Sequence, residues 1–410
     1  MRHQLPVLPI ELSVNGAAVT LATSLSERLG TVPLDSSEVV QFIARELSWQ
    51  LGHASYEQLT RCLRSWAEAM DRRDFLGALG WAATAAAVAS PVDGLDADEL
   101  VRLDRVVAGV HHLDVDAIAH IEAVLSAARR LDDALGPQAA LDTVLAQRSV
   151  ARLLLAGCSQ RLLPQLLSTY SNLSSTAGWL YFDLNDFRSA WHHYQAARDA
   201  AHQVGDSDLS VYALSGMSRV AEWRGKRPLA VDLTAAAQRL TAQTGDIRLR
   251  AYVEGRSALV YAADRQADAC LRALDRAEEH LADVHGDTSA DSLVYFYDDE
   301  MLTYHKSKCH LQLDQPQKTL TITRQALASV DVTFTRDLAV AKLCLAKAYL
   351  AAGEADEGAT VTAEVAELAM QNRSPRLARD LRATRAEMEP WSQRPTVKQL
   401  DDRLAAYGLG

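Results

Sequence analysis

Apolar positions along most of the chain recur every three or four residues, which is the spacing of amphipathic helices. The stretch "SSEVVQFIARELSWQLG" places Val39, Ile43 and Leu47 at this spacing behind a serine that suits a helix N-cap. The stretch "DVDAIAHIEAVLSAARRLDDALG" repeats the pattern and stops at Gly136-Pro137, a strong helix terminator. The pattern therefore predicts an all-α protein for everything after the N-terminal residues.

The N-terminal end has a different pattern. In "IELSVNGAAVTL", apolar Ile10, Leu12 and Val14 alternate with other residues and lead into Asn15-Gly16. Asn-Gly beside an alternating run favours a tight hairpin turn, because both central residues of that turn need positive φ. We predict a small N-terminal β-hairpin plus helical segment over residues 1–70.

The strongest pattern is an internal repeat. The segments "GWLYFDLNDFRSAWHHYQAA", "SRVAEWRGKRPLAVDLTAAA" and "ALVYAADRQADACLRALDRA" align with a shift of 40 residues, which brings Gly178, Ser218 and Ala258 into register. A fourth copy, "SKCHLQLDQPQKTLTITRQA", and a fifth, "AKAYLAAGEADEGATVTAEV", continue the series from Ser307 and Ala346. Repeats of this length predict stacked supersecondary units that bury a shared core.

Each copy has the pattern of a helix A, a short turn and a helix B. Polar or glycine residues fall at the turn, namely Asn185, Gly225, Asp314 and Gly353. The stretches "VGDSD", "TGDIR" and "VHGDT" predict helix B ends with Gly just past the helix and Asp as the next N-cap.

These offsets resemble the tetratricopeptide repeat. The resemblance implies a tetratricopeptide-like solenoid of helical hairpins, wound as a right-handed superhelix. We expect a helical linker or capping bundle over 71–160, about five repeats over 161–390, and a C-terminal capping helix over 391–410.

The stretch "DRRDFLGALGWAATAAAVASP" has the pattern of a twin-arginine export signal. Seventy residues that themselves have a folded pattern precede it, so a buried helix is the favoured interpretation. An exported binding protein stays an alternative if translation starts at Met70. No apolar run has the ~18–20 residues of a membrane span, and the widely spaced cysteines suit a reducing compartment, so we expect a cytoplasmic protein.

On a larger scale, the chain resembles the helix-turn-helix/tetratricopeptide regulators common in actinobacteria. The resemblance is carried by "IARELSWQLG", "DRRDFLGAL", "ALSGMSRVAEWRGKRPLAV" and "FTRDLAVAKLCLAKAYLAAGEADEGA", in that order. It implies a transcriptional regulator whose N-terminal helices read DNA. This chain departs from that pattern, because Ser48 and Trp49 stand where close helix packing wants small residues. We therefore expect the DNA-binding unit to be lost or replaced. A DNA-binding regulator that uses residues 36–66, with Arg61 and Arg64 as its cations, is the alternative.

No catalytic motif is present: GxSxG, HExxH, P-loop and GxGxxG patterns are absent. His305 and Cys309 stand one helical turn apart, but two ligands do not make a metal site. The net charge of -11 gives no global attraction to nucleic acid. We expect a non-enzymatic protein without cofactor or metal.

What remains is a binding surface. In a tetratricopeptide solenoid the A helices line a concave groove, and aromatic and cationic residues fall at the groove positions of this chain. The candidates are Asn172, Trp179, Tyr212, Arg219, Trp223, Tyr252, Arg256, Tyr304, Lys308 and Lys347. An inter-repeat core position is the alternative for Tyr252 and Phe182. Such a groove suits a protein, a peptide or a small-molecule ligand, and the ligand would modulate transcription or development. A homodimer mate is a further candidate partner.

Overall fold

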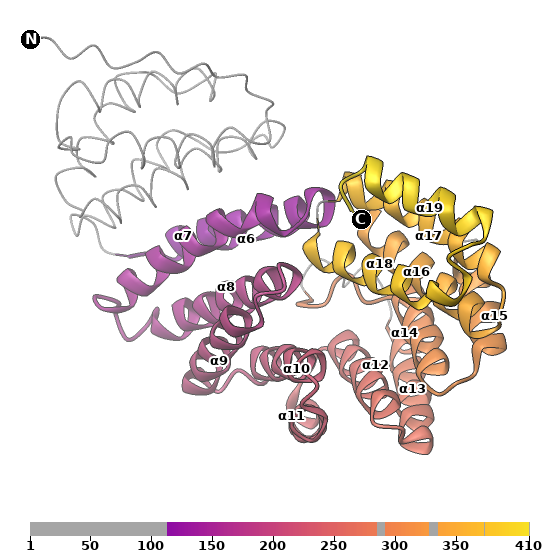
Figure 1. The fold of residues 1–410 in the computed structure, drawn as a ribbon. Helices are drawn as coiled ribbons and strands as arrows, with labels where there is room; N and C mark the ends of the chain where they lie inside the picture. Colours follow the sequence, from indigo (N-terminus) through magenta and orange to yellow (C-terminus); the bar gives the residue numbers. More distant parts are fainter. Residues whose placement is uncertain (1–112, 285–291, 328–334, 373, 410) are drawn as a thin grey trace, which may run out of the picture. The chain divides into compact units, whose positions relative to one another are not determined.

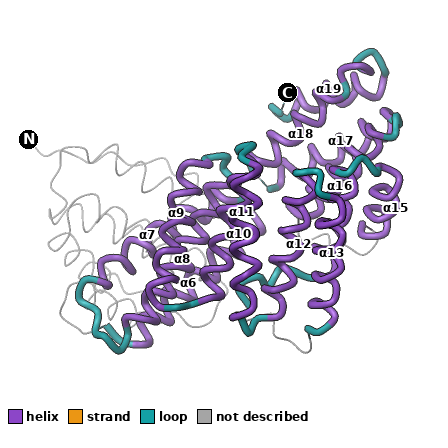
Figure 2. The backbone as a smooth tube through the Cα atoms, turned by 90° about the horizontal axis from the view of Figure 1, so that it is seen from below, coloured by secondary structure: helices purple, strands orange, loops and turns teal. Residues whose placement is uncertain are grey.

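The computed structural model describes residues 113–409, except 285–291, 328–334 and 373. Every described element is a helix, which confirms the all-α prediction for this part of the chain (Figures 1 and 2). The N-terminal β-hairpin, Arg61, Arg64 and the stretch after Met70 lie outside the described residues. None of the helices in the described ranges combines the length and hydropathy needed to cross a bilayer.

The chain divides into two compact units. Unit 1 comprises Met1–Ala128 and Asp142–Leu162, and unit 2 comprises Arg129–Leu141 and Leu163–Gly410. Helices α6 (Val115–Leu135) and α7 (Pro137–Leu155) contribute residues to both. The backbone leaves α6 at Gly136, whose φ is 92°, so the predicted stop at Gly136-Pro137 is confirmed.

Unit 2 contains five consecutive helical hairpins, in which each A helix is followed by a B helix. The A helices are α8 (Leu163–Asp183), α10 (Ser207–Trp223), α12 (Ile247–Ala263), α14 (Asp299–Gln312) and α16 (Thr335–Ala351). The B helices are α9 (Phe187–Val204), α11 (Arg227–Leu240), α13 (Ala267–Ala282), α15 (Pro316–Leu327) and α17 (Ala355–Gln371). A 3-10 turn, η1 (Thr241–Gln243), follows α11.

The turn inside each hairpin has a left-handed residue at the same place. The φ angles are 63° at Asn185, 70° at Gly225, 57° at Asp314 and 82° at Gly353, which confirms the predicted turn positions. Arg265 completes the set with a φ of 63°. Because arginine rarely adopts this conformation, its residue type did not mark the turn of the third copy.

Small residues let helices approach closely, both inside a hairpin and between neighbouring hairpins. A Cβ atom on Gly178 would lie 2.9 Å from the ring of Tyr194, and one on Gly216 only 2.2 Å from it. Tyr194 itself is 2% exposed, so its ring fills the space that these glycines leave. The residues that share the repeat register in the B helices are likewise buried, namely Ala190, Ala230 and Cys270 at one position and Ala197, Ala237 and Ala277 at another.

The predicted helix junctions hold in part. Gly205 is left-handed, and the Asp206 carboxylate caps α10 by accepting from the Leu209 N–H at 3.0 Å. Asp246 caps α12 in the same way. The prediction for Gly245 was wrong, because α11 already ends at Leu240 and the 3-10 turn takes the place of a glycine stop. The third junction, "VHGDT", lies largely outside the described residues.

After the hairpins, unit 2 ends in α18 (Pro375–Glu387), the turn η2 (Glu389–Trp391) and α19 (Pro395–Ala406). Leu377, Leu381, Val397 and Leu400 from these helices pack with residues of α16 and α17 into one apolar core. The helical structure therefore continues through α18 to a C-terminal helix, α19.

Candidate functional site

Three aromatic side chains from two neighbouring A helices form a continuous row. The ring of Trp179 stacks on Phe182 with centroids 5.7 Å apart, and Phe182 meets Trp223 edge-on at 5.6 Å. Trp179 and Phe182 share one face of α8 because they are three residues apart, and Trp223 comes from the end of α10. We call Trp179, Phe182 and Trp223 the aromatic row.

Cations from four elements lie over this row. Arg219 of α10 is 4.9 Å from the Trp179 ring, and Arg379 of α18 is 4.4 Å from the Trp223 ring. Lys308 of α14 lies 5.7 Å from the Trp223 ring. Arg336 and Arg376 also approach Trp179. Cations at these distances are attracted by the negative faces of the rings.

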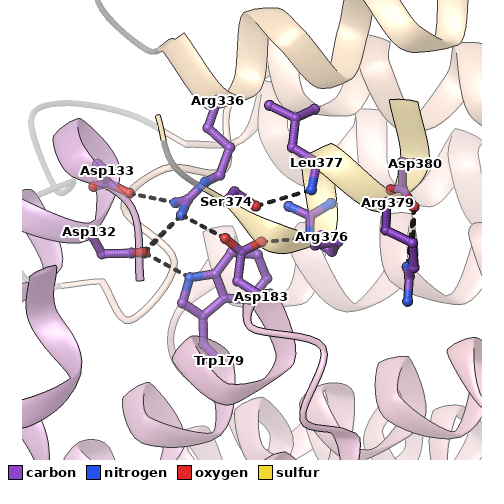
Figure 3. Close-up of polar contacts among 10 residues, drawn as sticks. All are labelled: Asp132, Asp133, Trp179, Asp183, Arg336, Ser374, Arg376, Leu377, Arg379 and Asp380. Atoms are coloured by element: carbon purple, nitrogen blue, oxygen red, sulfur yellow. Dashed lines mark hydrogen bonds and ion pairs between the residues drawn. The ribbon is translucent and has the colours of Figure 1, made fainter. Parts of the chain in front are cut away.

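A buried ion-pair cluster lies beside the aromatic row (Figure 3). Its members are Asp132, Asp133, Asp183, Arg336 and Arg376. The Asp183 side chain is fully buried, and its Oδ1 accepts from Arg376 Nε at 2.6 Å while its Oδ2 lies 3.8 Å from Arg336. Although burial acts to raise the pKa of Asp183, Arg376 and Arg336 outweigh it and hold that pKa below its usual value.

The other half of the cluster connects the end of α6 to α16. Arg336 donates to both carboxylate oxygens of Asp132 at 3.0 Å and to Asp133 at 3.0 Å. Asp132 also accepts the Trp179 indole N–H at 2.9 Å, which fixes the orientation of the first ring of the row. Burial raises the pKa of Asp132 more than Arg336 lowers it. The cluster thus joins elements more than 190 residues apart in sequence.

Arg219 and Lys308 differ from the neighbouring cations in their partners. The neighbouring Arg256 pairs with Glu222 at 3.0 Å, and Arg379 pairs with Asp380 at 3.2 Å. Within the part of the chain that the structure describes, Arg219 and Lys308 form no ion pair: Arg219 donates to the Tyr252 hydroxyl at 2.8 Å, and Lys308 faces the Trp223 ring. Both side chains are half-buried. Burial lowers the pKa of Lys308, against the attraction of Glu222.

The structure brings four of the ten predicted groove residues together at the aromatic row. Trp179, Arg219, Trp223 and Lys308 meet at the row. Tyr212 lies beside Tyr252, with centroids 6.1 Å apart.

The remaining candidates have other surroundings. Tyr252 and Arg256 are 2% and 6% exposed, so they belong to the core more than to an accessible surface. Tyr304 contacts His305, and Asn172 accepts from Arg129. Lys347 does not join the row: it pairs with Glu387 at 3.3 Å and lines a separate pocket.

Sequence reasoning missed the charged partners that come from α6, from the A helices α8 and α16, and from α18. They are Asp132, Asp133, Asp183, Arg336, Arg376 and Arg379. The spacing of Arg376 and Arg379 on one face of α18 was a usable signal, since two arginines one turn apart on a helix that follows the repeats point at a shared neighbour. Across the described residues, no group of His, Cys, Asp or Glu side chains is arranged to hold a metal ion.

No family model matches the chain, and no curated protein sequence matches it. Solved structures that resemble it in fold include three helical proteins. Aspartyl phosphate phosphatase F from Bacillus subtilis has 10% identity and a TM-score of 0.48, with 89% of this chain and 96% of that chain covered. BtubC (BKLC) from P. vanneervenii has 16% identity and a TM-score of 0.39, with 60% and 90% covered.

The third is a Signal Transduction ATPase with Numerous Domains that carries a tetratricopeptide repeat sensor, from Pyrococcus horikoshii. It has 11% identity and a TM-score of 0.39, with 95% of this chain and 64% of that chain covered. Similarity at this level concerns the fold alone.

Proposed function

We propose that unit 2 is a binding module for an acidic segment of a partner protein, and that this segment binds along the aromatic row. The observation that carries the proposal is the pair of half-buried cations, Arg219 and Lys308, that form no ion pair among the described residues. Glu222 attracts both cations, but its carboxylate is already paired with Arg256 at 3.0 Å. The hydration that the two cations lose therefore returns only partly from Glu222 and from the ring faces. An anionic ligand group would supply a direct partner.

The aromatic row supports a ligand with apolar side chains beside its acidic ones. Trp179 and Trp223 are half-buried, so part of each indole stays open to solvent. Partly exposed tryptophans flanked by arginines are the residue types that dominate binding energy at protein interfaces. An extended segment that alternates acidic and apolar residues matches both the rings and the two cations.

The ion-pair cluster would give this surface a fixed shape before binding. Arg336 and Arg376 are held by three aspartates, and Asp132 holds the Trp179 indole. A surface that is ordered in advance loses less conformational entropy when the ligand arrives. The role we propose is therefore that of a cytoplasmic, non-enzymatic regulatory scaffold, and the resemblance to helix-turn-helix/tetratricopeptide regulators favours transcription as the process that it modulates.

The test is a titration of the full-length protein with a fluorescein-labelled peptide of twelve residues that alternates Glu with Phe or Leu, followed by fluorescence anisotropy. We expect saturable binding that weakens as salt rises, and none for the matched peptide in which Lys replaces Glu. Arg219→Gln and Lys308→Gln should each weaken binding about tenfold, the loss of one charge-assisted contact. Arg198→Gln is the matched control, because Arg198 lies on α9 and pairs with Asp199 there.

Two outcomes would contradict the proposal. Equal binding of the Glu and Lys peptides would mean that Arg219 and Lys308 select no anion. Tight, salt-sensitive binding of a labelled 20-base-pair DNA duplex, with no binding of either peptide, would favour the DNA-binding alternative that uses residues 36–66.

A further inference from the structure

A pocket of about 510 Å³ lies in unit 2, and none of its lining residues belongs to the aromatic row. The C-terminal ends of α12, α14 and α16 surround it, together with Arg227 at the start of α11 and with Glu387 and Trp391 at the end of α18 and in η2. Its volume is in the range of pockets that hold small molecules. It exists because small residues, Ala262, Ala263 and Ala351, stand at the helix ends where larger side chains would fill it.

The lining of the pocket is about half apolar and half polar. The apolar half consists of the three alanines, Leu311, Leu350 and the Trp391 indole, which packs against the C-terminal core. Burying an aliphatic chain against such a lining contributes about 0.8 kcal/mol per methylene at most. A ligand that contacts this half of the pocket therefore has an apolar segment.

Charged side chains at the pocket determine the charge of the ligand. Asp314 is paired with Arg265, and Glu387 with Lys347. Arg227 is the third cation, and it forms no ion pair with any residue in the described ranges. The pocket therefore has one positive charge in excess.

The helix ends do not reverse this preference. A helix C-terminus carries partial negative charge on its free carbonyl groups. Here carbonyls of the last turns are already bonded by the left-handed turns: Ala262 O accepts from Arg265 N at 3.0 Å, Leu311 O from Asp314 N at 3.1 Å, and Leu350 O from Gly353 N at 3.0 Å. The side chains thus decide the sign.

We propose that this pocket binds an aliphatic monocarboxylate, with the chain against the alanines, leucines and Trp391 and the carboxylate at Arg227. A second carboxylate on the ligand would face Asp314 or Glu387, so dicarboxylates bind more weakly. A cationic ligand would have to compete with Arg265 or Lys347 for carboxylates that are already paired. The site does not depend on the acidic segment proposed above, because the two share no contact residue.

The experiment uses full-length protein and octanoate, observed by saturation-transfer NMR and by calorimetry. We expect a Kd of about 0.1–1 mM, the range open to a ligand of this size. Octanamide, which has the same chain without the charge, and octanedioate should each bind about tenfold more weakly. Arg227→Gln should abolish the difference between octanoate and octanamide, whereas Arg224→Gln, an exposed arginine that does not line the pocket, should leave it unchanged.

A second variant tests the location. Ala351→Phe places a ring in the pocket from an exposed position at the end of α16, so it should block octanoate while thermal unfolding and acidic-peptide binding stay as in the parent protein. No binding of octanoate at 5 mM in either measurement would overturn the proposal. So would binding that is as tight for octanamide, or that survives both Arg227→Gln and Ala351→Phe.

Discussion

The ion-pair cluster and the turn of the third and fourth hairpins use the same chemistry in opposite surroundings. In the cluster, the side chains of Asp183, Arg336 and Arg376 are 0%, 8% and 9% exposed. At the turns, the pair Arg265–Asp314 is 61% and 76% exposed. Water already solvates the second pair, while the first has exchanged its water for protein partners. Removing one charge therefore has very different consequences at the two places.

The largest expected effect follows from Asp183→Asn. The substitution keeps the shape but leaves Arg376 and Arg336 buried without that carboxylate, which costs about 3–5 kcal/mol. Asp314→Asn is the matched control, because asparagine tolerates the left-handed backbone there and the lost pair is exposed; its effect should stay below about 1 kcal/mol. Urea denaturation of both variants measures the difference. Equal losses would mean that Asp183 is solvated in solution.

Close packing inside the helices, like the ion-pair cluster, should tolerate little change. Gly216 lies inside helix α10, where there is no room for a side chain, because a Cβ atom at this position would lie 2.2 Å from the buried Tyr194 ring. Gly216→Ala should therefore destabilise the protein by about 1–3 kcal/mol through overpacking. The double variant with Tyr194→Leu frees the space, so its loss should be smaller than the sum of the two single losses. Additive losses in denaturation would show that the ring moves aside without cost.

Acid should also destabilise the protein through the buried side chain of His305. Burial, together with Arg256, Lys308 and Arg219, holds the pKa of His305 well below its ordinary value. Above about pH 6.5 both folded and unfolded chains carry a neutral imidazole. As the pH falls below this value, the unfolded chain takes up a proton that the folded chain refuses, so the free energy of unfolding decreases.

Burial raises the pKa of Asp132, which acts in the opposite direction at lower pH, so the comparison needs a variant. His305→Gln removes the imidazole, and we expect its stability to fall less than that of the parent protein between pH 7.5 and 5.5. Parallel pH profiles from denaturation would show that His305 titrates normally.

How far the sequence could predict each region follows from the range of its interactions. The hairpins depend on signals within about forty residues: small residues in register, and turn residues such as Asn185 and Gly353 that accept positive φ. The same register also placed Trp179, Arg219 and Lys308 together. The ion-pair cluster joins Asp132 to Arg336 across 204 positions, and no local pattern links such residues.

Lys347 shows that the repeat register does not determine the partner of a side chain. It occupies a predicted groove position, yet a glutamate on α18, outside the repeats, pairs with it at the pocket. A repeat pattern predicts the position of a residue on its helix, but it does not predict which element from another part of the chain will pair with that residue.

The smallest expected effect concerns Arg265, where the repeat pattern and the residue type disagree. The residue has a φ of 63°, a conformation that costs about 1 kcal/mol for a residue with a Cβ and little for glycine. Arg265→Gly also removes the exposed pair with Asp314, so Arg265→Ala, which loses the same pair and keeps the Cβ, is the reference. The glycine variant should be more stable than the alanine variant by up to about 1 kcal/mol, reduced by the greater freedom of glycine in the unfolded chain.

Gly225→Ala, at the equivalent turn with a φ of 70°, should lower the free energy of unfolding by a similar amount. Denaturation midpoints of the three variants test this directly, and an alanine variant as stable as the glycine variant would mean that the third turn is not left-handed.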